Sequence, residues 1–291
     1  MTGHSIKRQG RATFLIVASA VCWSFAGLLS KFTPWNALSL VGFRALLAVL
    51  LLGWARRSFR PVHTAGNWLG ALGVVSTAVL FIFANKLTSA ANAIVLQYAM
   101  PAVVVVLQAI LFRVTPTKTD IIATLLVMVG VLLCFYQGLG GGGLVGDLLS
   151  LSSSVTWALV FLAARMPNAD AVSYTYMGNL LGCGFLVSIF FDPGIETGGT
   201  VGWLVAVAMG LCLGIGYLCF GKGLSTGLSL TVAAVVANVE PILNPTWVFL
   251  FMGENPGTLA IVGSVIVLAA ATWHSMKQRP SAAIDKQSRL S

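Results

Sequence analysis

The sequence predicts an all-α integral membrane protein, with ten transmembrane helices in two inverted five-helix repeats. Three observations lead to this prediction. Of the 291 residues, 57% are hydrophobic and only 9% are charged, whereas a soluble domain carries roughly a quarter charged residues. Apolar runs of about 20 residues, long enough to cross a bilayer, recur along the whole chain. The two halves of the chain also carry similar features at corresponding positions.

Charges, glycines and prolines separate the ten apolar segments. The expected spans cover residues 12–30, 36–55, 67–86, 90–112, 119–137, 145–164, 170–191, 200–222, 228–252 and 256–276. Residues 1–137 form the first expected repeat and 145–276 the second, joined by a flexible Gly-rich linker at 138–144. The polar tail, 277–291, is expected to be disordered. The first run resembles a signal peptide, but it continues to Leu29 and is interpreted as a spanning helix.

Most of the 17 Lys and Arg residues lie on one side of this arrangement. They include the basic residues before the first span, the loop residues Arg56, Arg57 and Arg60, and those of the tail. Lys31 and Lys86 lie on the opposite side. Because positive loops stay in the cytoplasm, both termini are expected there. Placement of the positive charge at the ends of apolar runs argues against a nucleic-acid partner.

Two features recur between the halves. Trp23 and Trp157 each precede a basic residue, Lys31 or Arg165, by eight positions at the end of a span. Pro101 in the fourth span corresponds to Pro241 in the ninth. Since five spans is an odd number, the second copy must be inverted in the membrane. Inverted repeats are typical of secondary transporters, which bind substrate between the two halves near the bilayer midplane.

Polar residues interrupt the fourth and ninth spans beside prolines. A proline removes a helical hydrogen bond, so Pro101, Pro241 and Pro245 are expected to kink these helices. The polar residues of the two spans are Asn92, Gln97, Tyr98, Asn238 and Asn244. They either line a cavity that binds a small solute or join helices through hydrogen bonds. Matched clusters in both halves favour the cavity.

Three charged residues lie within or at the ends of spans. Glu240 is the single carboxylate near a span centre, and it either carries a proton for coupled transport or bonds to a carbonyl at the kink. Arg44 either binds a substrate carboxylate, holds a gate, or makes a structural contact, and the structural reading is favoured. Lys86 is a further gate candidate. The aromatic residues Trp23, Tyr98, Trp157, Tyr217 and Trp247 are expected to form a cavity wall, although each one alone also suits packing.

The sequence gives little support for an enzyme. The five cysteines form no C-x-x-C pair, and no histidine lies near one, so neither a metal nor a cofactor is expected. The segment "GLSTG", Gly223 to Gly227, matches the G-x-S-x-G nucleophile motif. It lies in a short loop between expected helices with no histidine nearby, and is interpreted as coincidental.

The chain resembles the EamA-type proteins of the drug/metabolite transporter superfamily. The residues that carry the resemblance are "KLTSAANAIVLQYAMP" (Lys86 to Pro101), "EP" at Glu240–Pro241 and "MGENP" (Met252 to Pro256). The first half departs from the family's glutamate signature, because its matching segment reads "FRVTP". Glu254 is therefore interpreted as a structural residue at a helix end.

The resemblance implies an inner-membrane carrier with a central cavity, most similar to bacterial exporters of aromatic amino acids. The expected function is export of neutral, including aromatic, amino acids by alternating access, with a small-molecule substrate and the lipid bilayer as partners. A broad-specificity drug or metabolite exporter is the alternative, and an intramembrane enzyme or receptor is a more distant one. The sequence leaves the energy source and the oligomeric state open.

Overall fold

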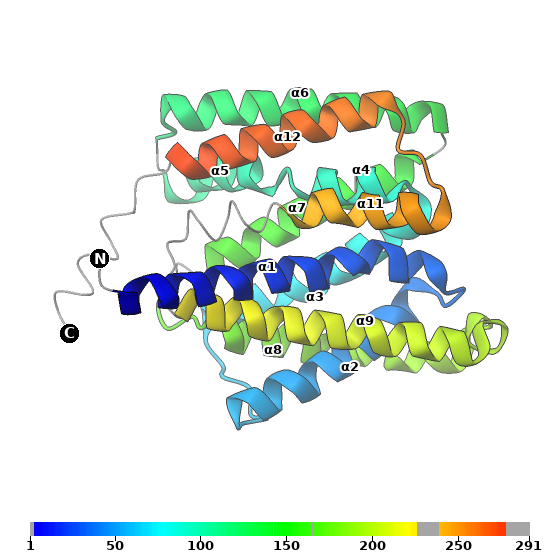
Figure 1. Ribbon diagram of the computed structural model, residues 1–291. Helices are drawn as coiled ribbons and strands as arrows, with labels where there is room; N and C mark the ends of the chain where they lie inside the picture. The colour runs from blue at the N-terminus through cyan, green and yellow to red at the C-terminus, as the bar shows by residue number, and fades with distance from the viewer. Residues whose placement is uncertain (1–2, 114, 142, 164–165, 226–238, 278–291) are drawn as a thin grey trace.

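The structure is a computed structural model that describes residues 3–113, 115–141, 143–163, 166–225 and 239–277. These residues form a bundle of roughly parallel and antiparallel helices, and they include no strand. Helix α1 begins and α12 ends at the same end of the bundle, called here the terminal end (Figure 1). The opposite end, where α1 finishes at Phe32, is called the far end.

The helices follow the predicted spans closely. The first half contains α1 (Gly3–Phe32), α2 (Ala37–Arg56), α3 (Ala65–Leu87), α4 (Ala90–Gln97), α5 (Met100–Phe112) and α6 (Lys118–Gly141). The second contains α7 (Leu144–Ala163), α8 (Ala171–Gly182), the 3₁₀ helix η1 (Cys183–Phe191), α9 (Gly194–Ser225), α11 (Glu240–Met252) and α12 (Thr258–Lys277). The start of the predicted ninth span, 228–238, lies outside the described residues.

Two predicted boundaries need correction. The glycine run was predicted to be a flexible linker from residue 138, but α6 continues through it to Gly141. Glycine in a helix costs about 1 kcal/mol of free energy relative to alanine. In an apolar environment an unpaired backbone group costs more than that, which favours continuing the helix. The predicted eighth span, from residue 200, begins earlier as α9 at Gly194, with a kink at Gly199, whose φ is +49°.

Seven of the described helical segments are long and apolar enough to cross a membrane. The α12 segment Thr258–His274 is apolar but shorter. The count of ten spans therefore stays a prediction. The seven segments are Arg11–Phe32, Ala37–Arg56, Ala65–Leu87, Ala90–Ile110, Leu144–Ala163, Ala171–Phe191 and Gly194–Phe220.

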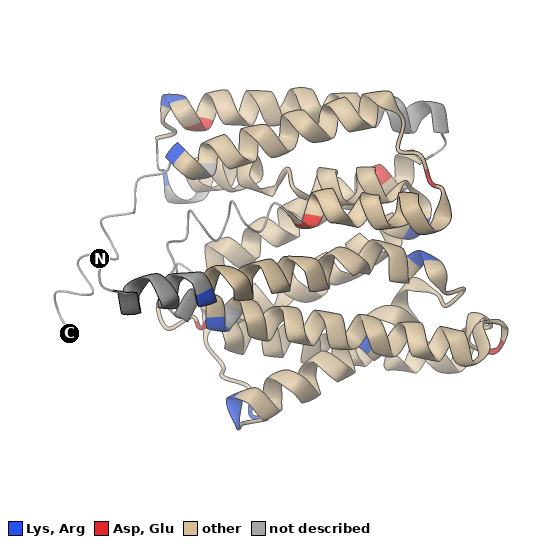
Figure 2. Cartoon of the chain, in the orientation of Figure 1, with Lys and Arg blue, Asp and Glu red and all other residues tan. Residues whose placement is uncertain are grey.

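Helix pairs from different halves form the bundle. Helix α1 packs along α9, and α3 packs along α7, while α6 and α12 form a pair at one side (Figure 1). Glycine permits the closest approach: a Cβ at Gly73 of α3 would lie 2.9 Å from the carbonyl oxygen of Thr156 in α7. Small residues serve this purpose in membrane helices. Figure 2 shows that Lys and Arg gather at helix ends and that charges within the bundle are few.

The prolines of the fourth and ninth spans lie at helix beginnings. Helix α4 ends at Gln97, and α5 starts at Met100 with Pro101 in its first turn. Helix α11 starts at Glu240 and has Pro241 in its first turn. A proline is tolerated in this position because the first N–H groups of a helix have no intrahelical partner. Of these three prolines, all within the described residues, Pro245 is the one inside a helix. The fourth span is thus broken into two helices rather than gently kinked.

Candidate functional site

The fourth span and the described part of the ninth span meet through a tyrosine and a glutamate. Tyr98, which follows the last residue of α4, donates its hydroxyl to Oε2 of Glu240 at 3.0 Å. Glu240 is half-buried and is the first residue of α11. The N-terminus of a helix carries a partial positive charge, which favours a carboxylate at this place. The structure therefore brings together polar residues of the fourth and ninth spans, as the sequence pattern predicts.

Asn244 lies one turn further along α11 and is completely buried, with 0% of its surface exposed. Among the residues that the structure describes, neither its amide nitrogen nor its amide oxygen has a hydrogen-bond partner. Its side chain lies against Gly27 of α1, where an added Cβ would collide with the amide oxygen. Leaving a buried polar group unpaired costs about 1–3 kcal/mol. Such a group is unusual in a folded protein and requires an explanation.

Aromatic side chains connect α1 with both neighbouring helices. The ring of Trp23 meets that of Tyr217 on α9 edge to face, with centroids 5.3 Å apart. Its indole nitrogen also donates to the carbonyl oxygen of Leu213 at 3.4 Å. On the other side of α1, Trp247 of α11 stacks on Phe25 with centroids 5.2 Å apart. Two of the predicted wall tryptophans thus lie on α1 and on its partner α11, the helix that carries Asn244.

Arg44 is buried inside the bundle, with 6% of its surface exposed. It donates to the carbonyl oxygen of Ala78 on α3 at 3.4 Å. A further buried amide, Asn179 of α8, was not singled out from the sequence; it donates its amide nitrogen to the carbonyl oxygen of Thr175 at 2.9 Å.

Several predicted site residues make contacts that join helices instead. Asn92 donates to both carboxylate oxygens of Asp147, at 3.2 and 3.1 Å, and to the carbonyl oxygen of Cys134. It thereby links α4 with α6 and α7. Trp157 packs in a cluster with Val74 and its neighbours on α7 and α8. These contacts fit the alternative reading, in which polar and aromatic groups hold the bundle together.

The remaining predicted residues lie elsewhere or outside the described chain. Lys86 is at the far end and donates to the carbonyl oxygen of Thr33 at 3.1 Å. Gln97 is half-buried at the end of α4. Asn238 lies outside the described residues.

A charged contact at the far end was not predicted. Nζ of Lys31, in the last turn of α1, lies 2.6 Å from Oε2 of Glu254, which follows α11. Oε1 of the same carboxylate accepts the backbone N–H of Ala90, the first residue of α4, at 2.6 Å. Glu254 was expected to be structural, and the motif "MGENP" was the signal for it. The contact ties three separate segments together.

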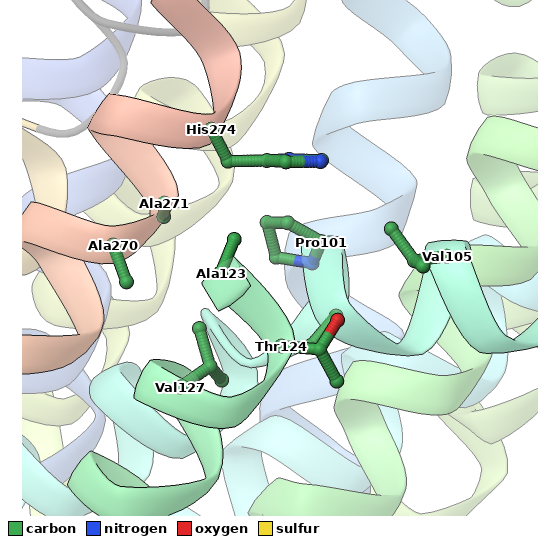
Figure 3. A pocket seen from close by; sticks show the side chains of 9 residues that line it. Pro101, Val105, Ala123, Thr124, Val127, Ala270, Ala271 and His274 are labelled. Atoms are coloured by element: carbon green, nitrogen blue, oxygen red, sulfur yellow. The ribbon is translucent and has the colours of Figure 1, made fainter. Parts of the chain in front are cut away.

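A recess on the side of the bundle is distinct from these groups. Its lining comes from α5, α6 and α12, and includes Pro101, Thr124 and His274 (Figure 3). His274 forms an ion-pair contact with Asp120, with Nε2 and Oδ1 separated by 2.6 Å. The lining of the recess is mostly apolar. It offers few polar groups for recognising a solute, so the central groups are the better candidate site.

Comparison with known proteins identifies the family. The EamA-like transporter family matches residues 10–136 and 144–276. The chain belongs to this family. EamA-like proteins are membrane transporters of the drug/metabolite superfamily, so this EamA-like chain is a multi-pass membrane transporter with a small-molecule substrate.

Two individual proteins resemble this EamA-like transporter. An uncharacterized protein of Pseudomonas aeruginosa is 28% identical over 252 residues, covering 82% of this chain and 86% of the relative. A protein of known crystal structure is 18% identical, with a TM-score of 0.59, and the match covers 91% of this chain and 96% of that one. This second likeness concerns the fold alone.

Proposed function

We propose that this transporter exports neutral amino acids, including aromatic ones, across the bacterial inner membrane by alternating access. The observation that carries the proposal is the buried, unpaired amide of Asn244. An amide offers both a donor and an acceptor, which suits the ammonium and carboxylate groups of an amino acid. The neighbouring Tyr98–Glu240 contact supplies further polar groups. Aromatic rings on α1, α9 and α11 supply an apolar surface for the substrate side chain.

Helix pairing supports the proposed inverted repeats. If spans one to five correspond to spans six to ten, the contact of α3 with α7 corresponds to that of α9 with α1. In the same way, the contact of α3 with α8 corresponds to that of α9 with α2, and that of α11 with α1 to that of α4 with α7. All of these pairs are in contact. Helices α1 and α7, the proposed counterparts, run in opposite directions across the bundle (Figure 1).

Substrate identity is tested by counterflow in proteoliposomes loaded with unlabelled amino acid. We expect uptake of labelled phenylalanine and tryptophan, because counterflow requires a carrier and no imposed gradient. Asn244→Ala should reduce uptake at least about tenfold, the effect of losing one or two hydrogen bonds. Asn85→Ala is the matched control, since Asn85 is also a fully buried asparagine, lying on α3 with an unpaired amide oxygen.

The outcomes separate the alternatives. Uptake by the parent protein and the Asn85 variant, with loss in the Asn244 variant, supports the proposal. No uptake of any amino acid by folded protein rejects the amino-acid substrate. Equal competition by chemically unrelated neutral solutes would replace it with a broad-specificity exporter. Unchanged uptake by Asn244→Ala would remove Asn244 from the site.

We also propose that Glu240 carries the proton if transport is driven by a proton gradient. Within the described residues its carboxylate accepts one hydrogen bond, from Tyr98, and Glu240 is the one acidic residue in the sequence of the predicted ninth span. Glu240→Gln keeps the hydrogen-bond acceptor but cannot exchange a proton. We expect this variant to retain counterflow and to lose any stimulation by a pH gradient. Gradient-driven uptake that persists in the variant would rule out this role.

A further inference from the structure

Arg44 is a buried cation without a buried anion to match it. The two ion pairs among the described residues join Lys31 to Glu254 and His274 to Asp120, so no described carboxylate lies within 4.0 Å of Arg44. The remaining acidic residue, Asp285, lies in the C-terminal tail outside the described residues. The guanidinium group has five N–H donors, and with the described residues it makes one hydrogen bond, of 3.4 Å, to the carbonyl oxygen of Ala78.

A purely structural arginine would be expected to look different. A buried guanidinium that holds helices together normally has a carboxylate or several carbonyl oxygens as partners, because an unpaired buried charge destabilises the fold. An arginine near a helix end can instead extend to the membrane surface. Arg44 is the eighth residue of α2 and only 6% exposed, so it does not reach the surface. Ionisable residues in this situation usually serve function.

The surroundings of Arg44 suit an anionic group of a solute. Its guanidinium has N–H donors to spare, and no described carboxylate is close enough to pair with it. An α-amino acid carries a carboxylate, which complements this charge.

We propose that Arg44 binds the carboxylate of the transported solute. A guanidinium can bind a carboxylate through two parallel hydrogen bonds, which gives orientation as well as affinity. The aromatic rings of Trp23 and Tyr217, on α1 and α9, would contact the solute side chain. The identification of the solute as an amino acid rests on the proposed function, whereas an anion site at Arg44 does not.

The proposal is tested with three labelled solutes that differ in one group: phenylalanine, phenylalaninamide and 2-phenylethylamine. The variants are Arg44→Met, Arg44→Lys and, as a control, Arg60→Met, because Arg60 is exposed at the terminal end. In Arg44→Met we expect phenylalanine binding and counterflow to fall about 10- to 100-fold, the effect of one charged hydrogen-bonded contact. The two solutes without a carboxylate should change less than about twofold, on the same scale. Arg44→Lys should recover part of the loss.

Thermal unfolding in detergent is a second measurement. Loss of a structural arginine would lower the unfolding temperature, whereas loss of a solute-binding arginine would not. Without solute, Arg44→Met should unfold at the same or a higher temperature than the parent protein, because an unpaired charge has been removed. Phenylalanine should raise the unfolding temperature of the parent protein and of Arg60→Met, but not that of Arg44→Met. A large loss of stability in Arg44→Met without solute would assign Arg44 a structural role and overturn the proposal.

Failure of this proposal differs from failure of the proposed function. If the parent protein transports phenylalanine and Arg44→Met affects all three solutes equally, amino-acid transport stands and the carboxylate role falls. If no amino acid is transported, benzoate and inorganic phosphate serve as probes. Stabilisation of the parent protein alone by either anion would keep the anion site while rejecting the amino acid. If neither anion nor amino acid stabilises the parent protein, both proposals are rejected.

Discussion

Removal of the contact between Lys31 and Glu254 has an effect on the free energy of unfolding that can be calculated from the structure. The two side chains are 15% and 26% exposed, and their charged atoms are 2.6 Å apart. Glu254 also accepts the backbone N–H of Ala90 at 2.6 Å, as a capping residue does at a helix N-terminus. Lys31 additionally donates to the carbonyl oxygen of Thr88 at 2.9 Å. One carboxylate thus joins α1, the start of α4 and the segment after α11.

Two substitutions separate these contributions. Glu254→Gln keeps an oxygen for the N–H of Ala90 but loses the charge, so its cost is that of the ion pair. Exposed ion pairs contribute about 0.2–1 kcal/mol, and this pair is mostly buried, so we expect about 1 kcal/mol. Glu254→Ala also loses the capping interaction, which contributes about 1 kcal/mol. Its total cost should be about 2 kcal/mol.

The assay is thermal or denaturant unfolding of the purified protein in detergent, arranged as a double-mutant cycle with Lys31→Met. The double variant Lys31→Met with Glu254→Gln should be less destabilised than the sum of the single variants, by about 1 kcal/mol. Additive effects would show that the two charges do not interact in solution. Equal stability of Glu254→Ala and Glu254→Gln would contradict the capping role.

Substitutions at two further positions test the packing and polar contacts of the bundle. Gly130→Val places a Cβ 2.7 Å from the backbone oxygen of Gly263, so α6 and α12 must separate. We expect the unfolding free energy to fall by about 1–3 kcal/mol, and an unchanged unfolding temperature would contradict this packing. Asp147→Ala removes the acceptor for the Thr88 hydroxyl, 2.6 Å away, and for the Asn92 amide, which should cost about 1–3 kcal/mol. Asp147→Asn should cost less, and equal losses would show that acceptor oxygens at this position do not matter.

Much of the helical architecture follows directly from the sequence. In lipid, backbone groups must be paired within the protein, so long apolar runs have to become helices. Ser89 caps α4 by accepting the N–H of Asn92 at 3.1 Å, and prolines mark the beginnings of α5 and α11. The 3₁₀ stretch Cys183–Phe191 was not predicted, because its apolar sequence gives no local signal that separates it from an α-helix.

The functional assignment of individual polar residues was less predictable. Asn92 and Asn244 look alike in the sequence, since each is an asparagine in an apolar segment near a proline. In the structure Asn92 meets Asp147, whereas Asn244 meets Gly27, which has no side chain to pair with it. The difference depends on how each helix is rotated toward its neighbour. Periodicity within one helix does not contain that information.

The distribution of paired and unpaired polar groups has a consequence for transport. At the far end, Glu254 and Asp147 each accept several hydrogen bonds, and these contacts hold the helices together there. Within the described residues, Arg44 makes a single hydrogen bond and Asn244 makes none. A solute that pairs with these two central residues would gain free energy that the protein alone does not have. A ligand shifts a conformational equilibrium only through different affinities for its states. The free energy of binding at these groups can therefore offset the cost of breaking the far-end contacts. The proposed alternating-access cycle requires such an offset.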